Sequence, residues 1–82
     1  MNKNELAQMH EYVDEHYVLK GRSELPQDQS KEFYEGYSHG IQQGMKLLTE
    51  CRDSKLISNT DISTIIPLFG GFLIASGEKT IE

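Results

Sequence analysis

The segment HEYVDEH, residues 10–16, is where metal-binding chemistry has to be considered first. A helical zinc site of the protease type needs histidines four residues apart, so that both imidazoles face one metal ion. The histidines here are His10 and His16, which lie about 240° apart around a helix and therefore face different directions. A pair of His10 with Asp14 and a third ligand such as His39 is left open by the spacing. The pattern as a whole favours no metal site and no cofactor.

Nucleophilic catalysis by cysteine requires a nearby cation or helix N-terminus that favours the thiolate. Cys51 falls on the apolar side of a predicted helix, where a thiol normally behaves as a small hydrophobe. Arg52 follows it in sequence but falls on a different face of the helix. The chain has no phosphate-binding loop, dinucleotide fingerprint or nucleophile elbow. We therefore predict a protein that is not an enzyme.

Length and charge restrict the remaining classes. A chain of 82 residues forms a single domain, 1–82, and buries only about 60% of its unfolded surface, so a partner subunit is expected. The single cysteine excludes an intramolecular disulfide and, with no signal peptide at the N-terminus, predicts a cytoplasmic protein. A net charge of −5 does not favour binding to nucleic acid, whose affinity comes largely from cations on phosphate.

The first helix is predicted over residues 5–20, because apolar residues recur there at spacings of three and four. These residues are Leu6, Met9, Val13 and Tyr17. Asn2, with Glu5 three residues later, is a candidate N-cap, and Asn4 is the alternative. Gly21 is predicted to end this helix in a left-handed conformation.

A second helix is predicted over residues 28–52, after the break at Pro26. Its apolar face consists of Phe33, Tyr37, Ile41, Met45 and Leu48. Glycines recur every fourth residue beside this face, at Gly36, Gly40 and Gly44. Each costs a helix roughly 0.5–1 kcal/mol relative to alanine. We therefore predict that another helix packs closely against them, and the sequence leaves open whether that helix belongs to the same chain.

A third helix is predicted over residues 59–76, with Ser58 as its N-cap and Asp61 three residues later. Its helically spaced apolar residues are Ile62, Ile65, Ile66, Phe69, Phe72 and Leu73. Pro67 is expected to kink this helix. The alternative is a hairpin that turns at Gly70-Gly71, which would make the protein α+β.

Together these patterns predict a small all-α domain that acts as a non-catalytic protein-interaction module. It would be a self-associating inhibitor, adaptor or regulator, dimeric or larger, that binds another macromolecule. The predicted interface comprises Phe33, Gly36, Tyr37, Gly40, Ile41, Gly44, Met45, Phe69, Phe72 and Leu73. One alternative is an oligomer with a small-molecule or nucleotide pocket between subunits. Another is a peripheral membrane protein, although anionic lipid would repel the acidic chain. A membrane-spanning helix is not favoured, because the uncharged stretch 62–77 is shorter than the roughly 20 residues that span a bilayer.

Overall fold

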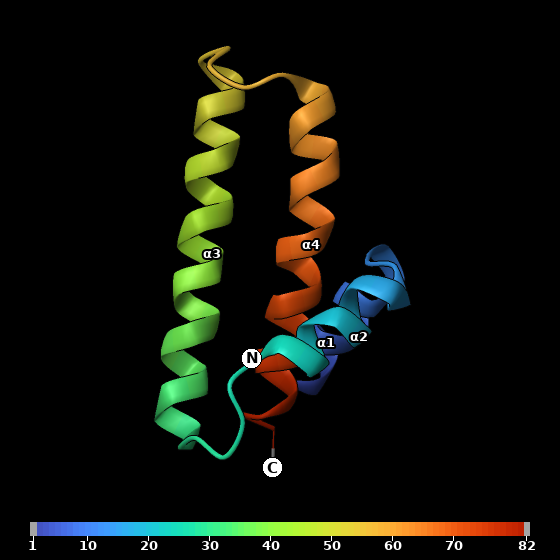
Figure 1. The fold of residues 1–82 in the computed structure, drawn as a ribbon, viewed down its shortest axis with the longest axis vertical. Coiled ribbons are helices and arrows are strands. Elements are labelled where there is room, and N and C mark those ends of the chain that lie inside the picture. The colour runs from blue at the N-terminus through green and yellow to red at the C-terminus, as the bar shows by residue number, and fades with distance from the viewer. Residues whose placement is uncertain (1, 82) are drawn as a thin grey trace.

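Helix α4, Asn59–Glu78, is the element against which the other three helices pack. The structure, a computed structural model, describes residues 2–81. Within that range the preceding helices are α1 (Lys3–Tyr12), α2 (Glu15–Glu24) and α3 (Lys31–Asp53). No strand occurs between residues 2 and 81, so the all-α prediction is confirmed. Figure 1 shows α3 and α4 as a long antiparallel pair, with α1 and α2 crossing the C-terminal half of α4.

The single helix predicted over 5–20 is wrong, because the chain forms two helices there. Val13 is extended and ends α1, and Asp14 is the N-cap of α2, where its side chain accepts a hydrogen bond from the His16 amide at 2.8 Å. A short acidic side chain can satisfy a free amide in this way and so start a new helix. Gly21 does not end a helix. It lies inside α2, and no glycine between residues 2 and 81 has a positive φ.

The other predicted helix starts rest on side-chain caps. Asn2 accepts from the Glu5 amide at 2.9 Å, so Asn2 and not Asn4 caps α1. Ser58 accepts from the Asp61 amide at 3.1 Å and caps α4, as predicted. Helix α3 begins at Lys31 because Ser30 caps it. Each cap satisfies a backbone donor that the first helical turn leaves unpaired.

Helix α4 continues through Pro67 and through Gly70-Gly71, so the alternative hairpin is wrong. A two-residue hairpin turn would need positive φ at one or both glycines, and neither has it. Both glycines are instead buried. Their role is to provide a side of α4 without side chains.

Helix α2 uses that side to approach α4 closely. A Cβ atom added to Gly71 would lie 2.2 Å from the Tyr17 carbonyl oxygen, and one added to Gly21 would lie 2.7 Å from the Gly71 carbonyl oxygen. No real Cβ atom tolerates such distances from backbone atoms. Val18 on α2 and Ile74 on α4 are both fully buried. Glycine therefore permits backbone-to-backbone packing between α2 and α4.

Helix α3 packs on α4 through polar as well as apolar contacts. Tyr34 forms a buried cluster with Leu25 and Ala75, and its hydroxyl donates to the Pro26 carbonyl at 2.7 Å. The hydroxyls of Ser38 and Ser76 lie 2.6 Å apart, and that of Ser76 also donates to the Leu73 carbonyl. Because a hydroxyl carries one proton, Ser38 is the donor in the pair. These contacts fix the N-terminal half of α3 against α4.

The adjacent glycines of α4 allow a matched test of close packing. Gly71→Ala places a methyl group against the backbone of α2, and we expect it to lower the free energy of unfolding by at least about 2 kcal/mol. Gly70→Ala meets the side chain of Val13, whose nearer methyl group lies 2.9 Å away and which can shift more readily than a backbone. We expect that change to stay within about 1 kcal/mol, since alanine also favours the helix. Urea denaturation followed by circular dichroism measures both, and equal effects would contradict the packing described.

Candidate interaction surface

The predicted interface residues are mostly exposed or half-buried in this chain. Phe33 is 39% exposed, and Tyr37, Ile41, Met45, Phe69 and Phe72 are half-buried. Gly36 and Gly40 are exposed, and Gly44 is half-buried. Leu73 differs from the rest, because it is only 5% exposed and belongs to the core.

The glycines of α3 pack against nothing within the described chain. A Cβ atom added to Gly36, Gly40 or Gly44 would meet no atom within 4 Å. The steric argument for close packing therefore holds for Gly21 and Gly71, which the sequence did not single out for it. For the three glycines of α3, only a contact with another molecule remains as a prediction.

The sides of α3 and α4 that face the core differ from those that apolar spacing predicts. Tyr34 and Ser38 are the buried residues of α3, whereas Phe33 is exposed and Tyr37 is half-buried against the Tyr34 cluster. On α4, Ile62 and Leu73 are buried as apolar spacing predicts, but Gly70, Gly71, Ala75 and Ser76 are buried as well. The reason is geometric: α2 needs small residues on α4, so the side that bears Phe69 and Phe72 is turned away from it. The exposed apolar surface is a consequence of this packing of α2 on α4.

We define the apolar face as the open side of α3 together with the adjoining edge of α4. Its members are Phe33, Gly36, Tyr37, Gly40, Ile41, Gly44, Leu47, Leu68, Phe69 and Phe72. A groove of about 180 Å³ lies within it, lined by residues of both helices. Phe33 extends this groove along α3, since its ring centroid is 6.1 Å from that of Tyr37. No member of the apolar face carries a charge.

A second, wider groove lies near the other end of the α3–α4 pair. Its volume is about 500 Å³. It is lined by Met45, Lys46, Thr49, Arg52, Ile62, Ser63, Ile66 and Pro67. Two cationic side chains thus stand beside an apolar floor, and Arg52 also lies 3.5 Å from the carboxylate of Asp53. This arrangement suits an amphipathic anion better than a purely apolar ligand.

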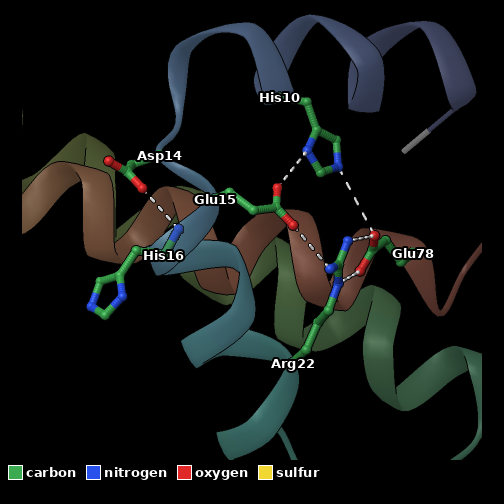
Figure 2. Close-up of polar contacts among 6 residues, drawn as sticks. All are labelled: His10, Asp14, Glu15, His16, Arg22 and Glu78. Atoms are coloured by element: carbon green, nitrogen blue, oxygen red, sulfur yellow. Dashed lines mark hydrogen bonds and ion pairs between the residues drawn. The ribbon is translucent and has the colours of Figure 1, made fainter.

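A polar cluster joins α1, α2 and α4 (Figure 2). Arg22 binds both carboxylate oxygens of Glu78, with Nη2 at 2.6 Å and Nε at 2.9 Å, and it also binds Glu15 at 3.2 Å. His10 lies 3.9 Å from both Glu15 and Glu78. Sequence reasoning missed this cluster, because Arg22 and Glu78 are 56 residues apart and no local pattern links them.

The charged groups of Arg22 and Glu78 shift each other's pKa values. Hydrogen bonding by Arg22 lowers the pKa of Glu78 below 4.5, against the opposing effect of partial burial, and the charge of Arg22 adds to the shift. In the same way Glu78 raises the pKa of Arg22. The bidentate geometry is the strong form of such a pair. The cluster is therefore a structural tie between helices.

The residues considered for metal binding serve other purposes here. Asp14 caps α2, and His10 lies between two carboxylates (Figure 2). Among residues 2–81, no group of three histidine, cysteine or acidic side chains could hold a metal ion. Of the tyrosines, Tyr12 on α1 is 85% exposed, whereas Tyr34 on α3 is in the core.

Comparisons with protein-family models, curated proteins and solved structures find no match to this chain. Among the described residues, α4 is the one helix long and apolar enough to cross a membrane. Of the 18-residue window of α4 that meets this criterion, 44% is buried inside the fold.

Neutralising Glu78 tests the polar cluster. We expect Glu78→Gln to lower the free energy of unfolding by about 1 kcal/mol, a value reduced because Arg22 is partly exposed to solvent. The matched control is Glu24→Gln, which removes an exposed pair with Lys20 and should cost at most about 0.5 kcal/mol.

The same variant has a distinct pH profile. Because the folded-state pKa of Glu78 is depressed, its contribution is present above the ordinary value of 4.5 and is lost as the pH falls below that value. Thermal unfolding between pH 7 and pH 3 should therefore show a smaller loss of stability for Glu78→Gln than for wild type. If the stability of the two proteins falls equally with pH, the Arg22–Glu78 pair does not stabilise the fold.

Proposed function

We propose that this protein is a non-catalytic interaction module that self-associates through the apolar face. It would act as an inhibitor, adaptor or regulator by binding another macromolecule. The observation that supports this proposal is the apolar face itself, which includes Phe33 at 39% exposed and Leu47 at 60% exposed. Contiguous apolar surfaces of this kind usually mark sites of association.

The apolar face supplies part of the area that a dimer would bury. The chain exposes 5437 Å², whereas a compact monomer of 9.4 kDa exposes about 5,000 Å². Along α3 the face runs from Phe33 to Leu47, about 21 Å, and two packed helices are about 20 Å across, so the face covers roughly 400 Å². A standard interface buries about 800 Å² per partner, with an apolar centre and a polar rim. The apolar face would form that centre, and the polar residues around it would supply the rest.

Charge also favours a second copy of the chain. The apolar face has no charged member, so two such faces can meet without burying an unpaired charge. The net charge of −5 on each copy opposes association at long range. Salt screens that repulsion, so a dimer should tighten as ionic strength rises, whereas docking on a basic partner should weaken.

Sedimentation equilibrium of two matched variants tests the proposal. Leu47→Glu introduces a charge into the apolar face at a site that is 60% exposed, so the fold should persist. We expect it to weaken dimerisation at least roughly tenfold. Leu19→Glu makes the same change on α2, away from the face, at a site that is 55% exposed. It should leave the dimer unchanged.

A monomeric wild type at all protein and salt concentrations would refute self-association. Binding to liposomes that is lost in Leu47→Glu would instead assign the apolar face to a membrane. Gly40→Leu offers a further check, because an added Cβ atom meets no other described residue within 4 Å and leucine improves helix propensity. The isolated chain should therefore gain stability while the dimer is lost.

A small-molecule function is the second candidate, and the wide groove with Lys46 and Arg52 is the observation that favours it. A bound amphipathic anion would raise the melting temperature by mass action. Octanoate and ATP are suitable probes of the lipid-like and nucleotide-like cases. We expect any increase in melting temperature to disappear in Arg52→Ala and to persist in Lys20→Ala, a cationic control on α2. No increase with either probe would remove this candidate.

A further inference from the structure

We infer that two copies of the chain pair through α3 in antiparallel orientation, with the two-fold axis passing between the two Gly40 residues. This inference rests on the proposed self-association and specifies its geometry. It follows from the spacing of large and small residues on the open side of α3, where no other described residue packs against the three glycines.

The spacing is symmetric about Gly40. Gly36 and Gly44 lie four residues before and after it, and Phe33 and Leu47 lie seven residues before and after it. In a two-fold interface, each residue i that contacts residue j of the other copy is matched by j contacting i. Antiparallel helices that cross at Gly40 therefore bring Gly36 opposite Gly44 and Phe33 opposite Leu47. Each glycine meets a glycine, and each large apolar side chain meets another.

All five residues lie on one side of α3. At 100° per residue they fall within an arc of about 80°, which is centred on Gly40. Apart from the nearby backbone of α3 itself, no described residue lies within 4 Å of a Cβ atom at any of the three glycines, so a second backbone has room to approach. Phe33 and Leu47 are the large apolar residues of α3 with the greatest exposure. They lie at the two ends of the row formed by Gly36, Gly40 and Gly44, and they would close this row at both ends.

The groove beside α3 extends the same interface. Tyr37 and Ile41 continue the face toward Phe69 and Phe72 of α4, so the contact need not be limited to one helix. Glu32 and Glu50 lie together on the other flank of the stripe, at about 80° from Gly40 around the helix. Antiparallel pairing brings these acidic residues of the two copies near each other. This adds to the repulsion that salt would screen.

Parallel pairing would give different neighbours. Phe33 would face Phe33, and Cys51 would lie beside Cys51 of the other copy. In the antiparallel arrangement the two Cys51 residues are separated by 22 helical positions, or about 33 Å. A disulfide requires Cα atoms about 4.4–6.8 Å apart. Cysteine cross-linking can therefore distinguish the two orientations.

The experiment uses the full chain in a Cys51→Ser background. One variant carries Phe33→Cys and the other Leu47→Cys, and each is oxidised alone and after mixing, with circular dichroism to verify the fold. We expect a disulfide-linked dimer in the mixture and none in either variant alone, because like positions lie about 21 Å apart. Leu19→Cys, mixed with either variant, is the control and should form no cross-link.

Each other result has a defined meaning. Cross-linking of either variant with itself would overturn the antiparallel arrangement in favour of a parallel one. No cross-link in the mixture, with wild type still dimeric by sedimentation, would overturn the inference while the proposed self-association stands. A monomeric wild type would overturn both. Oxidation of wild type provides a check that needs no variant, since a Cys51–Cys51 dimer would contradict the antiparallel model.

Discussion

The backbone contact between α2 and α4 is the constraint on which the rest of the structure depends. Gly21 and Gly71 bring the two helices so close that neither position has room for a Cβ atom. The same approach aligns α2 along the C-terminal half of α4. It places Arg22, the residue after Gly21, within reach of Glu78, two turns beyond Gly71. Shape complementarity thus comes first, and the ionic tie follows from it.

This constraint also explains why so much apolar surface stays open. The small residues of α4 pack against α2, and the adjoining side of α4 packs against α3. Its aromatic residues Phe69 and Phe72 consequently lie at the edge of the packed surface. Helix α3 is anchored by Tyr34 and by the buried hydroxyl of Ser38 instead of by its most apolar side.

The sequence predicts the helical class and the caps well, because Asn2 and Ser58 act on residues three positions away. It misses the break at Asp14, since apolar spacing continues across that residue. Glycine does permit close helix packing in this protein, but at Gly21 and Gly71 and not at the three glycines of α3. Helical spacing shows only that glycines share one side of a helix, and not which other helix packs against them. The faces of α3 and α4 could not be assigned, because both helices have small and apolar residues on more than one side. Of the ten residues of the apolar face, all except Leu47 and Leu68 belong to the interface predicted from sequence. The Arg22–Glu78 pair was not predicted, because no local pattern links residues so far apart in the chain.

The central position of α4 has a consequence for biosynthesis. Helices α1, α2 and α3 each pack on α4, which is the last of the four to be made. A nascent chain that stops before Asn59 therefore has three amphipathic segments and lacks the surface that buries them. Such segments would persist as fluctuating helices until translation supplies α4, after which all three can dock.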